Sequence, residues 1–127
     1  MYGLSHVKDE RLHRLFRENK VCFETPSEDP ESWFNILVLH QNRAKRGPTN
    51  YIPDSFLPSF FHIVVWGHEH DCRIVPEGPD SDQPFFITQP GSPCATSLCE
   101  VVKVVNCQLR ADFTETCRLL HIWQELI

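Results

Sequence analysis

Three histidines in this sequence follow closely on runs of apolar residues. His40 comes directly after WFNILVL, and His68 and His70 come after IVVW and a single glycine, Gly67. Imidazole is a common ligand of divalent first-row metals such as zinc, manganese and iron. A glycine lets the backbone bend sharply, and alternation along an extended chain then places the His68 and His70 rings on one side. The pattern favours a metal site. The other interpretation, a buried strand followed by a glycine turn and two solvated histidines, stays open.

The other histidines carry weaker signals. His6 and His13 lie in or beside a predicted helix, His62 begins a predicted strand, and His121 lies on an apolar stripe. Histidines in such places are expected to be packed or exposed rather than to act as ligands. A hydrolytic two-metal site also needs carboxylates to bridge its ions, and no Asp or Glu follows a predicted strand in the way that these three histidines do.

The elements that position the three histidines can be predicted from hydrophobic periodicity. Asp9 to Lys20 has leucine and phenylalanine at helical spacing with acids in its first turn, which predicts an amphipathic helix. Short runs that are almost wholly apolar predict strands buried on both faces. These runs are Trp33 to Leu39, Phe61 to Trp66 and Phe85 to Thr88. Pro53 or Asp54 is expected to open a short helix, SFLPSFFH, weakened by Pro58.

This arrangement predicts an α/β fold with a layered sheet. In open α/β sheets, ligands bind beyond the carboxyl ends of the strands. Here the predicted strand ends carry the polar sequences HQNR, GHEH and QPGS. The three histidines are therefore expected to meet at one edge of the sheet.

Composition sets further limits. The chain has 127 residues and a formal net charge of −5, which argues against electrostatic docking on DNA as a property of the whole chain. The cluster Arg43, Lys45 and Arg46 is more simply a solvated loop.

No apolar run approaches the ~20 residues that a membrane span needs, and no apolar signal segment follows Met1, so a soluble intracellular protein is expected. Six cysteines without any CxxC pair favour reduced thiols over a zinc site.

Four segments together resemble one family. YGLSHVKDERL, WFNILVLHQNR, FLPSFFHIVVWGHEHDCRI and FFITQPGSPCATSL are similar, in order and spacing, to the Mre-eleven family of double-strand break repair nucleases. The resemblance runs from about Tyr2 to Leu98. It implies a calcineurin-like metallophosphoesterase fold, with residues 1–98 as the C-terminal half of the nuclease domain. Residues 99–127 depart from the family pattern, and their own residue pattern predicts a strand and a helix in this divergent tail.

The resemblance also implies a site. It assigns His40 and His68 to one Mn²⁺ ion and His70 to a neighbouring Mn²⁺ ion, and it places Gln41, Asn42 and Arg43 in a loop that faces DNA. The implied activity is Mn²⁺-dependent hydrolysis of phosphodiesters by metal-activated water, as endonuclease and 3'-5' exonuclease. The implied partners are DNA ends, a Rad-fifty-like ATPase, an Nbs-one-like subunit and a second copy of the full-length protein, in the nucleus.

The departures from the family pattern bear on activity. The family's D-x-H, G-D and G-N-H-D motifs do not occur in these 127 residues. They supply the remaining metal ligands and the general-acid histidine, so no catalytic acid is assigned here and the chain alone is expected to be inactive. A non-catalytic remnant or regulatory isoform that binds partner proteins or DNA is the alternative. A truncated gene model, a splice product and a decayed copy remain open as origins.

Overall fold

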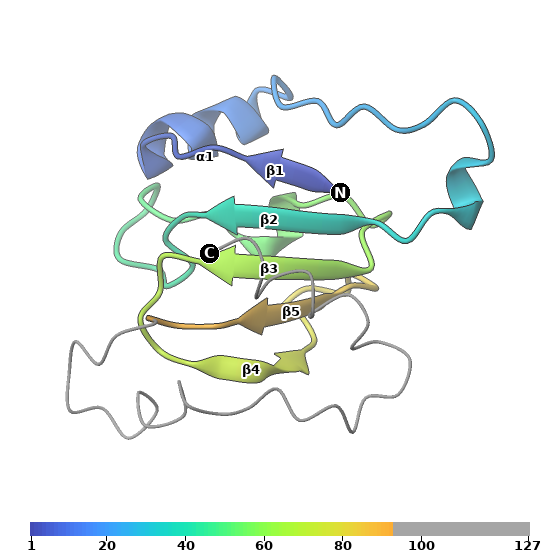
Figure 1. Ribbon diagram of the computed structural model, residues 1–127. Helices are drawn as coiled ribbons and strands as arrows, with labels where there is room; N and C mark the ends of the chain where they lie inside the picture. The colour runs from blue at the N-terminus through green and yellow to red at the C-terminus, as the bar shows by residue number, and fades with distance from the viewer. Residues whose placement is uncertain (93–127) are drawn as a thin grey trace.

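The computed structural model describes residues 1–92, which form a single mixed sheet with one α-helix (Figure 1). The strands are β1 (Tyr2–Leu4), β2 (Ile36–His40), β3 (Ile63–Gly67), β4 (Arg73–Glu77) and β5 (Phe86–Gln89), and the helix is α1 (Asp9–Arg17). Two short 3₁₀ turns lie at Pro30–Ser32 and Asp54–Phe56. The expected α/β class is confirmed at this level. The predicted elements beyond Leu98, and the cysteines from Cys94 onward, lie outside the described residues.

The sheet order brings the carboxyl ends of four strands to one edge. The order is β1-β2-β3-β5-β4, and the first four of these strands are mutually parallel, whereas β4 runs antiparallel to β5. In Figure 1 the arrowheads of β1, β2, β3 and β5 accordingly point the same way. The HQNR, GHEH and QPGS sequences therefore begin at the same edge, as the sequence predicted.

Several predicted elements are shorter than expected. The strand predicted from Trp33 begins at Ile36, because the exposed Trp33 and Phe34 lead out of the 3₁₀ turn. The predicted SFLPSFFH helix is only the turn Asp54–Phe56, since a residue before proline avoids the helical region and Leu57, before Pro58, has ψ 136°. The helix α1 likewise ends at Arg17, and Asn19 reverses the chain with φ 54°.

Two strands were not predicted. β1 is only three residues long, too short for a periodic signal. β4 was not predicted because it contains Pro76 and has charged residues at both ends. A proline is tolerated in an edge strand because one side of that strand needs no ladder hydrogen bonds, and β4 is at the end of the sheet.

The apolar core lies on one face of the sheet. Alternate residues of the three longest parallel strands are 0–2% exposed and pack with residues from α1 and the connecting loops: Leu37, Leu39, Val64, Trp66, Ile87, Leu12, Ile52, Leu57, Phe61 and Phe85. The opposite face of β2 is only half-buried, at Ile36 and Val38, so the expectation that this strand is buried on both faces is wrong. The same expectation for β3 is confirmed, because Val65, on the opposite face, is 7% exposed. Among the described strand residues, Phe86 and Val75 are large apolar side chains that stay exposed, at 56% and 78%.

The neighbouring residues Phe85 and Phe86 give a matched test of this one-sided core. Phe85→Ala should destabilise the fold by about 3–5 kcal/mol, the usual cost of removing a buried phenylalanine side chain, because Phe85 is 1% exposed. Phe86→Ala should cost far less, since Phe86 is 56% exposed. Urea unfolding of both variants measures the difference, and equal losses would contradict the placement of the main core on the Phe85 side of the sheet.

Candidate metal-binding edge of the sheet

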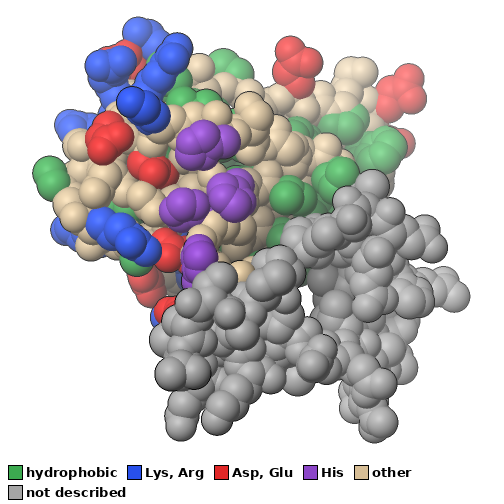
Figure 2. All heavy atoms as spheres, turned by 60° about the vertical axis from the view of Figure 1, so that its left-hand side comes forward, with side chains coloured by type: hydrophobic (Ala, Val, Ile, Leu, Met, Phe, Trp, Pro, Cys, Tyr) green, Lys and Arg blue, Asp and Glu red, His purple; other side chains and the backbone are tan. Residues whose placement is uncertain are grey.

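The pairing of β2 with β3 sets His40 beside the glycine that precedes His68. The two strands are parallel and in continuous register from Ile36↔Ile63 to His40↔Gly67. His40 is the last residue of β2, and His68 follows the last residue of β3. Figure 2 views this edge and shows histidine side chains gathered in one patch.

The His40 and His68 rings are in direct contact. His68 Nδ1 lies 3.3 Å from His40 Nε2, and the ring centroids are 5.1 Å apart with the planes nearly perpendicular. Two nitrogens bound to one ion at about 2.1 Å stand roughly 3.0–3.4 Å apart in octahedral or tetrahedral geometry. The separation therefore fits two adjacent ligands of a single ion.

A glycine is needed at position 67 because a side chain there would collide with His40, and not because Gly67 adopts a positive φ. A Cβ built on Gly67 would lie 2.9 Å from His40 Nδ1 and 3.2 Å from the Leu39 carbonyl oxygen. The bend predicted at the glycine is instead at His68, which has φ 79°. A non-glycine residue in this region is uncommon and persists where its surroundings hold it. The conformation breaks the alternation that was expected to place His68 and His70 on one side.

The surroundings of His40 favour its neutral form. Desolvation is the largest cause, and the neighbouring His68 and His6 add to it, so the pKa of His40 is below its ordinary value. The His6 ring lies 6.4 Å from that of His40, centroid to centroid. Neutral imidazole is the form that binds metals. No role was predicted for His6, because nothing in the residue pattern shows that the segment after β1 passes the end of β2.

His70 is exposed, and its carbonyl oxygen accepts a hydrogen bond from the Ser92 amide at 3.3 Å. Within residues 1–92 as described, no group of three or more His, Cys, Asp or Glu side chains is placed to hold a metal ion. The structure thus joins His40 with His68, the pair assigned to one ion from the resemblance, and does not assemble a three-histidine cluster. Metal binding by any of the three stays a prediction.

The resemblance implied that Gln41 and Asn42 lie in a loop that faces DNA, which stays a prediction, but both side chains are occupied by contacts within the chain. Gln41 is 1% exposed, and its amide bonds both the N–H and the carbonyl of Val7, at 3.2 and 2.7 Å. The Asp9 carboxylate, in the first turn of α1, accepts from the Gln41 and Asn42 side-chain amides at 2.8 and 2.9 Å. These polar side chains fasten the loop after β2 to the start of α1.

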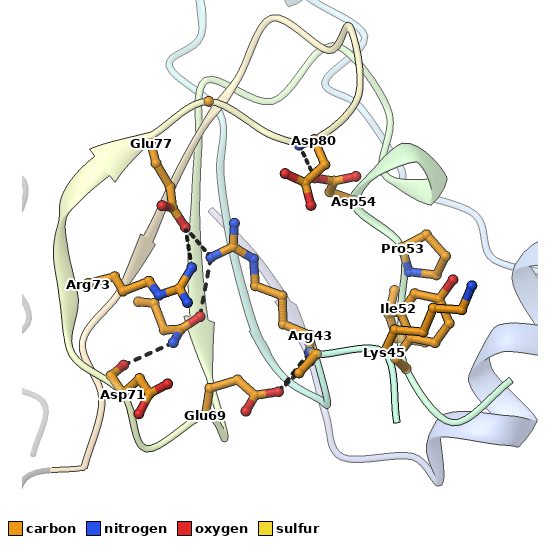
Figure 3. A pocket seen from close by; sticks show the side chains of 14 residues that line it. Arg43, Lys45, Ile52, Pro53, Asp54, Glu69, Asp71, Arg73, Glu77 and Asp80 are labelled. Carbon is orange, nitrogen blue, oxygen red and sulfur yellow. Dashed lines mark hydrogen bonds and ion pairs between the residues drawn. The ribbon is translucent and has the colours of Figure 1, made fainter. Parts of the chain in front are cut away.

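Arg43 is also turned inward. Its guanidinium pairs with Glu77 and Gln89, and its central carbon lies 5.7 Å from the centre of the Trp66 ring. Figure 3 shows this group directed toward β4, within a cleft of about 460 Å³ lined largely by charged side chains. The cleft does not include His40 or His68. The QPGS segment contributes Gln89, which is 4% exposed and also donates to the Asp71 carbonyl at 2.9 Å.

Glu69, between the two histidines of GHEH, connects the two loops. One of its carboxylate oxygens accepts the backbone N–H groups of Arg43 and Ala44 at 2.8 and 2.9 Å, and the other accepts from Arg46 at 3.3 Å. Partial burial raises the pKa of Glu69, but these donors outweigh it and hold the pKa below its ordinary value. The sequence analysis assigned no role to Glu69, because its hydrogen-bond donors lie 23 to 26 residues away in the sequence.

The geometry defines an α/β domain that presents an imidazole pair where two parallel strands end. Over 98 residues the chain is 52% identical to the double-strand break repair protein MRE11 of Gallus gallus and to that of Homo sapiens, covering 77% of this chain and 14% of each relative. It is 42% identical over 106 residues to the double-strand break repair protein mre-11 of Caenorhabditis elegans, covering 77% of this chain and 15% of that relative. No family model matches the chain.

The chain belongs, over these matched residues, to the family of MRE11 double-strand break repair proteins, as its motifs indicated. It spans about 14% of the length of the curated relatives it matches. No helix among the described residues is long and apolar enough to cross a membrane.

The contact between His40 and His68 can be tested by titration. His40 should titrate below the ordinary histidine pKa of about 6.5, because desolvation, His68 and His6 all disfavour its charged form. In His68→Ala the pKa of His40 should rise without reaching the ordinary value, since desolvation, the largest cause, remains. NMR titration of the ring protons measures both values, and an unchanged pKa in His68→Ala would show that the rings do not interact.

The same shift predicts how stability depends on pH. The folded pKa of His40 is lowered, so the unfolded chain binds the proton first as the pH falls through the ordinary value. The contribution of His40 to the stability is therefore fully present above that value and declines as the pH falls below it. Replacing His40 with glutamine should flatten this part of the stability profile, measured by urea unfolding between pH 5 and pH 8.

Proposed function

We propose that this chain supplies part of the active site of a manganese-dependent DNA nuclease of double-strand break repair. The observation that carries the proposal is the 3.3 Å separation of His40 Nε2 and His68 Nδ1 at the carboxyl ends of parallel strands. Its family is that of MRE11 double-strand break repair proteins. A calcineurin-like metallophosphoesterase fold, completed by residues outside this sequence, is part of the same proposal.

The residues of this chain have a limited part in that chemistry. His40 and His68 would hold one manganese ion through two neutral nitrogens, and His70 would serve a second ion. When bound, manganese would supply Lewis-acid activation of water and stabilise charge on the phosphate oxygens. The chain's own contribution is to hold the two imidazoles in contact and to keep His40 unprotonated.

Partners and location follow from the same family. We propose that the complete site acts on DNA ends within an assembly containing a Rad-fifty-like ATPase, an Nbs-one-like subunit and a second copy of the full-length protein, in the nucleus. Of the loop predicted to face DNA, Gln41 is buried and the Arg43 guanidinium is ion-paired with Glu77. Contacts of this chain to the phosphate backbone would therefore fall to the exposed Lys45, and to Arg46, which is 60% exposed although it is ion-paired with Glu69.

Two observations favour a second, non-catalytic function. The described residues contain no group of three potential ligands, and the sheet exposes Phe86 and Val75. Exposed apolar groups on a sheet mark surfaces that pair with other chains. A role in binding a partner protein would use this surface and would not need the histidines.

A nuclease assay separates the two functions. The purified chain alone should not cleave DNA with Mn²⁺, because two or three imidazoles without carboxylates hold an ion loosely. The chain also lacks the family's general acid, and general-acid catalysis typically raises the rate by about 10²–10⁴-fold. Adding a polypeptide that carries the family's D-x-H, G-D and G-N-H-D motifs should restore cleavage.

His68→Ala is the control in both arms of this assay. The restored cleavage should disappear in His68→Ala, because the variant removes one of the two paired nitrogens. Cleavage by the chain alone that is lost in His68→Ala would show a self-sufficient enzyme. Restored cleavage that survives in His68→Ala would refute the assignment of the imidazole pair.

A further inference from the structure

The loops that carry the two paired histidines are joined by one carboxylate. Glu69 follows His68 directly, and its side chain is 11% exposed although it is charged. Its Oε1 atom accepts two consecutive backbone N–H groups, those of Arg43 and Ala44, at 2.8 and 2.9 Å. These two amides lie beyond the end of β2. Figure 3 shows the Glu69 side chain reaching across to the backbone of Arg43.

We propose that Glu69 is a positioning residue that holds the His68 ring against the His40 ring by clamping the loop after β3 to the loop after β2. The effect of Glu69 on metal affinity rests on the proposed function of the histidine pair, whereas its effect on the contact between the two rings does not depend on a metal. Glu69 itself does not touch either ring nitrogen in the hydrogen bonds that it makes.

The backbone of His68 explains why a clamp is needed. With φ 79°, His68 occupies a region that side chains disfavour. Such a conformation persists only when the structure on both sides determines it. On one side, β3 is fixed by its register with β2 through Gly67. On the other side, the first fixed group is the Glu69 carboxylate, with its two backbone bonds to the neighbouring loop.

The first residues of the loop after β2 are held by hydrogen bonds to Asp9, at the start of α1. Asp9 accepts the Asn42 backbone N–H at 3.1 Å, in addition to its bonds with the Gln41 and Asn42 side chains. The loop that is hydrogen-bonded to Glu69 is therefore itself fixed to α1, and through Glu69 it restrains the neighbouring residue His68. Loss of the Glu69 acceptor should free His68 to leave the left-handed region and separate the two rings.

The acceptor geometry and the charge can be separated by substitution. Glu69→Gln keeps a carbonyl oxygen where Oε1 accepts both backbone N–H groups, and it loses the ion pair with Arg46. Glu69→Asp keeps the charge but is one methylene too short to reach both groups. Arg46→Ala removes the ion pair alone and is the matched control, because Arg46 contacts only the second oxygen of Glu69.

The metal-free readout is the nuclear Overhauser effect between the His40 and His68 ring protons. It should be retained in Glu69→Gln and Arg46→Ala and lost in Glu69→Asp and Glu69→Ala, while the amide spectrum of the sheet stays unchanged. If Glu69→Ala fails to fold, the contrast between Glu69→Gln and Glu69→Asp still decides. Retention of the effect in Glu69→Asp, or its loss in Glu69→Gln, would overturn the proposal.

The second readout is Mn²⁺ affinity, measured by electron paramagnetic resonance of free Mn²⁺. Glu69→Asp should bind Mn²⁺ about 10–100-fold more weakly than the parent chain, the usual cost of losing a group that orients a metal ligand, and Glu69→Gln should bind within a few-fold of it. If the parent chain binds no Mn²⁺, the proposed function fails while the ring-contact experiment still tests Glu69. Equal affinity in Glu69→Asp and the parent would contradict the positioning role.

Discussion

Parallel pairing of β2 with β3 in one continuous register is the constraint on which the candidate site depends. The register places His40 opposite Gly67, so the next residue, His68, emerges beside the His40 ring. A shift of one residue would turn every buried side chain of β2 to the other face. Leu37 and Leu39 of β2, with Val64 and Trp66 of β3, lie in the core and are 0–2% exposed. The hydrophobic core thus fixes the register, and the register fixes the distance between the two imidazoles.

The polar side chains around this edge bond mainly to other residues of the chain and so hold the loops in place. Gln41 and Asn42 bond to Asp9 and Val7, Arg43 pairs with Glu77 and Gln89, and Glu69 bonds to the backbone after β2. Each of these groups is at least partly buried, where an unpaired polar atom is costly. The result is a rigid frame around an exposed imidazole pair. If the pair binds a metal ion, as proposed, such a frame would hold both ligands in place, which is worth more affinity than two histidines on a flexible loop.

Much of the fold and part of the site could be predicted from local pattern. The apolar runs before His40 and Gly67 identified two parallel strands, and the rule for strand ends in open sheets brought their histidines together. The short β1 strand, the proline-containing β4 strand and the turn at His68 carry no periodic signal, so they depend on tertiary contacts that local sequence does not encode. For the same reason the inward bonds of Gln41 and Arg43 were not foreseen, because their partners Val7, Glu77 and Gln89 lie 34 to 46 residues away in sequence.

The central claim is that His40 and His68 form one metal-binding unit where β2 and β3 end. The most direct test is to add Mn²⁺ in substoichiometric amounts and follow the paramagnetic broadening of the histidine ring signals. His62 is the internal reference, because it lies just before β3 while His68 lies just after it. A strand rises by about 3.3 Å per residue, so the length of β3 separates His62 from the proposed site. The account predicts that the His40 and His68 signals broaden together and well before that of His62. Equal broadening of all three, or broadening of neither His40 nor His68, would contradict it.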